Sequence, residues 1–72
     1  LNSKLRGRLV RILTEATGMD ARTCETALAE AGGDTRVALV SLLGGVPSEH
    51  AAVALRDAQG SVREALRRLT AA

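Results

Sequence analysis

The sequence contains no phenylalanine, tyrosine or tryptophan, so its hydrophobic core must be built from aliphatic side chains. Its one cysteine, Cys24, excludes an internal disulfide bond and is typical of a reducing compartment such as the cytoplasm. With one histidine, His50, no spacing typical of a metal site exists. No run approaches the roughly 20 apolar residues that span a bilayer, and no segment has the pattern of a signal peptide.

Length and charge exclude little more. At 72 residues the chain is one domain near the lower size limit for a self-sufficient core. Its formal net charge of +2 is too small to define a partner, and Lys4 is the only lysine among the basic residues. The chain begins with Leu1 rather than Met, so we expect it to be a fragment of a longer protein, and its alanine and arginine content favours a bacterial source.

What the sequence does contain is an internal repeat with a shift of 27 positions. Each copy has an apolar stripe, a glycine that ends a helix, a capping side chain and a second apolar stripe. The matching pairs are Ala27/Ala54, Leu28/Leu55, Ala31/Ala58, Gly33/Gly60, Arg36/Arg63, Ala38/Ala65, Leu39/Leu66 and Leu42/Leu69. A repeat of this kind predicts two similar helix–turn–helix units and carries packing residues rather than chemistry.

The apolar spacing predicts an all-α fold, a small bundle of five short helices with no strand. Gly18, Gly32-Gly33, Gly44-Gly45 and Gln59-Gly60 are expected to end helices, and Asp20, Asp34, Ser48 and Ser61 to cap the starts of the following ones. Ser61 and Glu64 have the spacing of a capping box. We expect residues 1–45 to form a three-helix unit and residues 46–72 a two-helix half-repeat packed on it.

The expected inner faces follow from the same spacing. They comprise Leu5, Leu9, Ile12, Leu13 and Ala16 in the first helix; Cys24, Ala27, Leu28 and Ala31 in the second; Val37, Ala38, Val40 and Leu42 in the third; Ala51, Ala52, Ala54, Leu55 and Ala58 in the fourth; and Val62, Ala65, Leu66 and Leu69 in the fifth.

No combination of residues predicts a reaction, so we assign no catalytic, cofactor-binding or metal-binding residue and no cofactor. His50 is expected on the solvent side of the fourth helix and Cys24 in the core. The glycine pairs lack the strand and the lysine of a phosphate-binding loop. The carboxylates are spread along the chain, and Glu64 is placed to pair with Arg68 four positions later.

Basic residues form two clusters, which leaves nucleic-acid binding open as an alternative. Lys4, Arg8 and Arg11 share a side of the first helix, and Arg63, Arg67 and Arg68 lie in the last. The low net charge and the absence of stacking aromatics favour solvated helix faces or domain contacts instead.

The first three helices resemble a ubiquitin-associated (UBA-like) domain. The resemblance rests on Thr17-Gly18-Met19, Ala27-Leu28, Gly32-Gly33-Asp34 and Leu42-Leu43, and the N-terminal domain of elongation factor Ts has a similar pattern. It implies a protein-binding module for ubiquitin or a translation factor, with Met19, Leu42 and Leu43 as the contact surface. However, the Gly18-Met19-Asp20 loop lacks the aromatic residue usual in ubiquitin-binding domains, which weakens the ubiquitin alternative.

The whole chain resembles the C-terminal helical region of bacterial N-acetylmuramic acid 6-phosphate etherases. The resemblance rests on Asn2-Ser3-Lys4-Leu5-Arg6, the Thr17-Gly18 turn, Ala31-Gly32-Gly33-Asp34, Gly45-Val46-Pro47-Ser48 and residues 58–66. It implies a cytoplasmic parent enzyme of peptidoglycan recycling, a carbon–oxygen lyase that converts its substrate to N-acetylglucosamine 6-phosphate and D-lactate.

The same resemblance implies that the catalytic carboxylates belong to an upstream sugar isomerase (SIS) domain outside this chain. This chain would then be a non-catalytic module that serves stability, dimerisation or covering of the sugar-binding cleft. Its expected partners are that domain and, through the parent, a second copy. Asn2 and Lys4 would lie at the junction with the missing domain.

Overall fold

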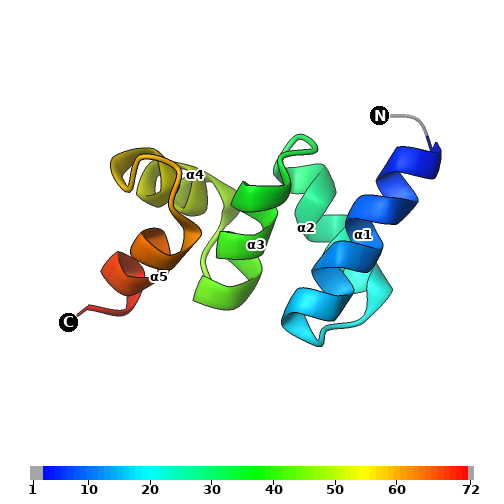
Figure 1. The fold of residues 1–72 in the computed structure, drawn as a ribbon, viewed down its shortest axis with the longest axis horizontal. Helices are drawn as coiled ribbons and strands as arrows, with labels where there is room; N and C mark the ends of the chain where they lie inside the picture. Colours follow the sequence, from blue (N-terminus) through cyan, green and yellow to red (C-terminus); the bar gives the residue numbers. More distant parts are fainter. Residues whose placement is uncertain (1–2, 72) are drawn as a thin grey trace.

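A computed structural model describes residues 3–71, and every element within that range is an α-helix. The helices are α1 (Ser3–Thr17), α2 (Ala21–Glu30), α3 (Thr35–Gly44), α4 (Ser48–Asp57) and α5 (Val62–Thr70). They form a small bundle of 37 × 21 × 16 Å, with α1 at one end, α3 in the middle and α4 and α5 at the other (Figure 1). The predicted all-α fold of five short helices is confirmed.

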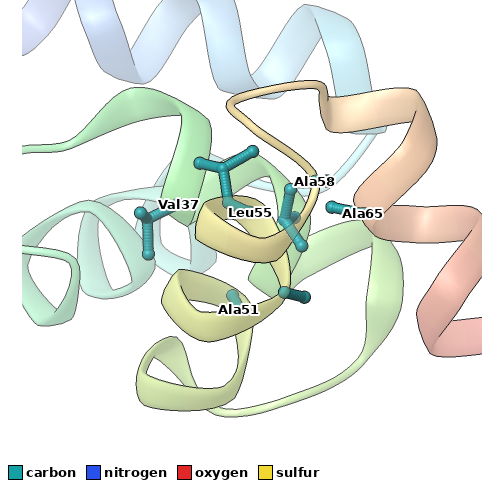
Figure 2. Packing of buried hydrophobic residues seen from close by; sticks show 7 residues of the cluster. Val37, Ala51, Leu55, Ala58 and Ala65 are labelled. Carbon is teal, nitrogen blue, oxygen red and sulfur yellow. The ribbon is translucent and has the colours of Figure 1, made fainter.

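The core consists of two aliphatic clusters, one on each side of α3. The N-terminal cluster joins α1, α2 and α3 through Val10, Leu13, Cys24, Ala27, Leu28 and Ala38. The C-terminal cluster joins α3, α4 and α5 through Val37, Val40, Ala51, Ala54, Leu55, Ala58 and Ala65 (Figure 2). Alanines supply a large share of both clusters, which allows these helices to approach one another closely. Because α3 contributes to both clusters, the two halves of the chain share one helix. The division into residues 1–45 and 46–72 stays a prediction.

The two turns of the repeat have the same hydrogen bonds, 27 positions apart. In the first turn the Gly33 amide donates to the Leu28 carbonyl at 2.9 Å, and in the second the Gly60 amide donates to the Leu55 carbonyl at 2.9 Å. The neighbouring bonds also recur, because Ala31 and Ala58 each donate to the carbonyl four residues earlier. The sequence repeat is therefore a repeat of backbone structure.

The inner face predicted for α1 is only partly correct. Leu13 is fully buried and Leu9 is half-buried, but Ile12 is 47% exposed and Leu5 is 39% exposed. Val10, which the prediction left out, is buried instead. The inward face is completed by Thr17 rather than Ala16: the Thr17 hydroxyl donates to the Leu13 carbonyl at 2.7 Å and lies 3.8 Å from the Cys24 sulfur. The predicted face was therefore wrong for Leu5, Ile12 and Ala16. The side of α1 that faces the core is the neighbouring one, with Val10, Leu13 and Thr17.

In the other helices the predicted inner faces are confirmed apart from Ala52, which is exposed. The repeat partners Leu28 and Leu55 are both buried, and the repeat partners Leu39 and Leu66 are both half-buried against the two clusters.

The caps of α2 and α3 are as predicted, while two other caps need correction. Asp20 accepts from the Thr23 amide at 2.8 Å, and Asp34 accepts from the Arg36 and Val37 amides at 3.1 and 3.2 Å. Ser48 is the first residue of α4 rather than its cap, and the capping position belongs to Pro47, which makes no side-chain cap bond. The Ser61 hydroxyl accepts from the Glu64 amide at 3.1 Å, which is one of the two bonds of a capping box. In the second bond the Ser61 amide would donate to the Glu64 carboxylate, but it donates to the Ala58 carbonyl instead.

No single helix in the described part of the chain is both long and apolar enough to cross a membrane. The pair α3 and α4 meets the length and composition criteria only when taken together, and it is bent by 108°.

Candidate functional site

The two side chains best suited to chemistry lie apart from each other and have different surroundings. Cys24 is fully buried in the N-terminal cluster, where its sulfur lies 3.9 Å from the Met19 carbonyl oxygen. His50 is exposed in the first turn of α4, on the other side of α3. Both positions agree with the predictions, and this arrangement does not bring a thiol and an imidazole together.

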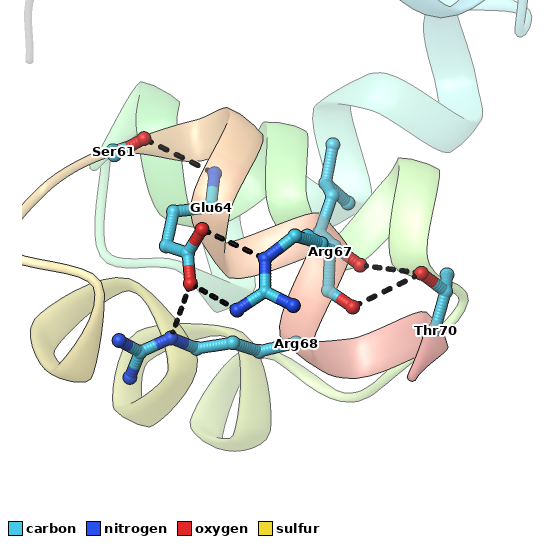
Figure 3. Close-up of polar contacts among 6 residues, drawn as sticks. Ser61, Glu64, Arg67, Arg68 and Thr70 are labelled. Carbon is cyan, nitrogen blue, oxygen red and sulfur yellow. Dashed lines mark hydrogen bonds and ion pairs between the residues drawn. The ribbon is translucent and has the colours of Figure 1, made fainter. Parts of the chain in front are cut away.

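Three of the carboxylates stabilise the helices to which they belong or whose starts they cap. Asp20 and Asp34 hold helix starts, and the hydrogen bonds from Thr23 keep the pKa of Asp20 below its ordinary value. Glu64 binds two guanidinium groups: Arg67 donates to its two oxygens at 2.9 and 2.6 Å, and Arg68 donates at 2.9 Å (Figure 3). The hydrogen bonds from Arg67, and next those from Arg68, lower the pKa of Glu64 to about 2. The predicted Glu64–Arg68 pair is confirmed, with Arg67 as an additional partner.

This ion-pair group also changes the C-terminal basic cluster. Two of its three members share the charge of Glu64, so the cationic surface of α5 is smaller than the sequence indicates. On α1, by contrast, Lys4, Arg8 and Arg11 are all exposed. The described residues contain no group of three or more His, Cys, Asp or Glu side chains placed to hold a metal ion.

Two hollows in the described part of the surface lie between helices, and neither Cys24 nor His50 is among their lining residues. A hollow of about 230 Å³ lies beside the first repeat turn and is lined by Arg6, Leu28, Ala29, Gly32 and Gly33. A groove of about 430 Å³ runs between α2 and α3, and Leu42 forms part of its wall. Neither combines a titratable base with a second acid, so neither has the geometry of a general acid–base site.

The predicted protein-contact residues are differently exposed. Met19 is 37% exposed and Leu43 is 45% exposed, whereas Leu42 is half-buried against the N-terminal cluster. Whether they act together in binding stays a prediction. Of the two predicted junction residues, Lys4 is exposed in the first turn of α1, and Asn2 lies outside the described residues.

An exposed apolar face of α1 was missed from the sequence. We call it the outer face of α1, and define it by Ile12 and Ala16, with Leu5 continuing the series toward the helix start. These residues were assigned to the core, although the 4-3-4 spacing of positions 5, 9, 12 and 16 marks a separate stripe from the one that contains Val10, Leu13 and Thr17.

Comparison with known proteins gives a consistent set of relatives. The chain is 43% identical over 65 residues to N-acetylmuramic acid 6-phosphate etherase 1 of Vibrio cholerae. The matched residues are 90% of the chain and 22% of the relative. It is 40% identical over 68 residues to the etherase of Halalkalibacterium halodurans, and the matched residues are 94% of the chain and 23% of the relative. It is 64% identical over 42 residues to the etherase of Thermobifida fusca, and the matched residues are 58% of the chain and 14% of the relative. No family model and no solved structure matches the chain.

These relatives are all etherases, and the chain is homologous to part of such an enzyme. Specifically, it matches a C-terminal fragment of the N-acetylmuramic acid 6-phosphate etherase family, which confirms the resemblance found in the sequence. The chain spans only about 14% to 23% of the length of the relatives described here.

Proposed function

We propose that this chain is the non-catalytic helical module of an N-acetylmuramic acid 6-phosphate etherase. The observation that carries the proposal is the similarity of 90% or more of the chain to the etherases of Vibrio cholerae and Halalkalibacterium halodurans. In the parent enzyme the lactyl ether would be cleaved by residues of the preceding domain, and the present chain would support that domain.

The way the fold uses its reactive side chains supports a non-catalytic role. The Cys24 thiol is enclosed by α1 and α2, His50 faces solvent, and Asp20, Asp34 and Glu64 are engaged in helix caps or ion pairs. General acid–base catalysis needs a positioned acid and base within hydrogen-bond reach of one substrate atom. The described residues support packing instead, through two aliphatic clusters that share α3.

As part of this proposal, the parent is a cytoplasmic bacterial enzyme with a sugar isomerase domain upstream, and the module stabilises that domain, contributes to a homodimer or covers the sugar-binding cleft. A single buried cysteine agrees with a reducing compartment. The UBA-like and nucleic-acid-binding alternatives have less support, because Leu42 contributes to packing and two arginines of α5 are paired with Glu64.

The proposal is tested with the full polypeptide of which this chain is a part. D-lactate release from N-acetylmuramic acid 6-phosphate is measured for that polypeptide, for residues 1–72 alone, and for the polypeptide lacking them. We expect release by the full polypeptide, none by residues 1–72, and a lower melting temperature or altered assembly without them. Absence of release from the full, folded polypeptide would contradict the proposed function.

A further inference from the structure

We propose that the outer face of α1 is an intramolecular docking surface, against which the preceding part of the same polypeptide packs. The inference rests on the proposed function, and it adds the surface through which the module acts. The partner segment should present apolar side chains together with carboxylates.

The first argument is the way apolar residues are distributed on α1. Val10, Leu13 and Thr17 face α2 and α3, and they complete the N-terminal cluster. Leu5, Ile12 and Ala16 lie on the adjacent side, offset by about 100° on a helix of 3.6 residues per turn. Ile12 is 47% exposed although it is among the largest apolar side chains of the helix. A helix with apolar residues on two adjacent sides is typical of one that contacts two bodies.

The second argument is the position of α1 in the molecule. It contacts α2 and α3, lies at one end of the bundle, and has no described element on its far side (Figure 1). The spacing of positions 5, 9, 12 and 16 runs through most of the helix. Alternating steps of four and three are the spacing by which one helix packs along another.

The third argument identifies the occupant as the preceding polypeptide. The chain matches a C-terminal fragment of its relatives and covers 23% or less of those described here, so most of the homologous protein precedes the matched region. That part of the polypeptide joins the described chain at the start of α1, where the outer face begins. A surface beside the connection meets a tethered partner at high effective concentration, which favours an intramolecular contact.

Charge disfavours a second copy of the chain as the occupant. Exposed Lys4, Arg6, Arg8 and Arg11 lie on α1, against one acidic residue, Glu15. Two such helices packed together would bring basic residues close to one another, which costs free energy at a desolvated interface. A segment with carboxylates opposite Arg8 and Arg11 would instead be attracted.

The test compares two substitutions of equal exposure within the full polypeptide. Ile12→Cys and Val53→Cys place a thiol at positions that are 47% and 45% exposed in this chain, one on the outer face of α1 and the other on α4. Maleimide labelling of each position is followed by peptide mass spectrometry, with Ala16→Cys as a second probe of the face. We expect labelling at position 12 to be at least ten-fold slower than at position 53. Arg8→Glu combined with Arg11→Glu should raise the rate at position 12.

Three outcomes would overturn the inference: equal labelling at positions 12 and 53, protection at position 12 that disappears on dilution, or no effect of the paired charge reversal. Protection that depends on concentration would identify a second copy as the occupant. Etherase activity measured on the same samples separates this test from that of the proposed function. An active enzyme with a rapidly labelled position 12 contradicts only the docking surface, whereas an inactive wild-type polypeptide contradicts the proposed function.

Discussion

Gln59 and Gly32 occupy equivalent positions in the two repeat turns, 27 residues apart, and both have a left-handed backbone, with φ of 56° and 64°. The backbone of the turn is thus preserved while the residue that best suits it is not. A left-handed backbone costs a residue with a Cβ atom about 1–2 kcal/mol, a cost that is absent for glycine.

Replacing Gln59 with glycine should therefore stabilise the fold. We expect Gln59→Gly to raise the free energy of unfolding by about 1 kcal/mol, measured by urea denaturation followed by far-UV circular dichroism. The reciprocal variant Gly32→Gln serves as the control and should lower the free energy of unfolding by a similar amount. A destabilising Gln59→Gly would show that the Gln59 side chain has a stabilising contact that outweighs the backbone term.

A second prediction tests the orientation of α1. Leu13 is fully buried and Ile12 is 47% exposed, so adjacent residues of similar size should respond very differently to truncation. Leu13→Ala should lower the free energy of unfolding of residues 1–72 by about 2–5 kcal/mol, because it leaves a cavity in the N-terminal cluster. Ile12→Ala should change it by about 0.5 kcal/mol or less. Equal losses would contradict the orientation described here.

This helix also shows how far the sequence predicts the structure. The turns were predictable because glycine and capping residues act locally, as at Gly18 and Asp20, and the turn at Gly33 recurs at Gly60. Burial of α1 was not predictable from spacing alone, because Leu9 belongs to two adjacent apolar stripes and only the positions of α2 and α3 decide between them. For the same reason the outer face, with Ile12, was missed as a candidate site.

The partners of the Glu64 carboxylate also could not be predicted from local sequence patterns. A capping box was expected between Ser61 and Glu64, but Arg67 and Arg68 compete for the same carboxylate and hold it. The amide of Ser61 is satisfied by the Ala58 carbonyl within the turn, which leaves the carboxylate available to the arginines.

A third prediction concerns the close approach of α3 and α5 at Gly44. A Cβ atom at position 44 would lie 3.0 Å from Leu69 Cδ1 and 3.6 Å from Leu66 Cδ2. Gly44→Val should therefore lower the free energy of unfolding by about 1–3 kcal/mol through overpacking. Gly7, also within a helix, has no atom within 4 Å of the equivalent position, so Gly7→Val is the matched control and should cause no comparable loss. A similar loss in both variants would show that the loss at position 44 does not come from contact with α5.

A fourth prediction is a pH dependence that originates from Glu64. Its pKa in the folded chain is about 2, below the ordinary value of 4.5, so the unfolded chain binds the proton more readily. The stability that Glu64 contributes is therefore complete above about pH 4.5 and is lost as the pH falls toward 2. Stability curves of Glu64→Gln between pH 6 and pH 2 should fall less steeply than those of the wild type. The paired variant Arg67→Gln with Arg68→Gln removes the cause of the shift and should reproduce the shallower curve; a wild-type slope in either variant would rule out this ion-pair group as the origin.

The central claim is that this chain supports an etherase without taking part in its chemistry. The most direct measurement is kcat for lactyl ether cleavage by the full polypeptide carrying single substitutions His50→Ala, Glu49→Gln, Glu25→Gln and Glu15→Gln, which remove exposed titratable groups of the module. We predict kcat within about two-fold of the wild type for each variant, since loss of a general acid or base costs about 100-fold or more. A loss of that size in any one variant, with its melting temperature unchanged, would place a catalytic residue in this chain and contradict the account.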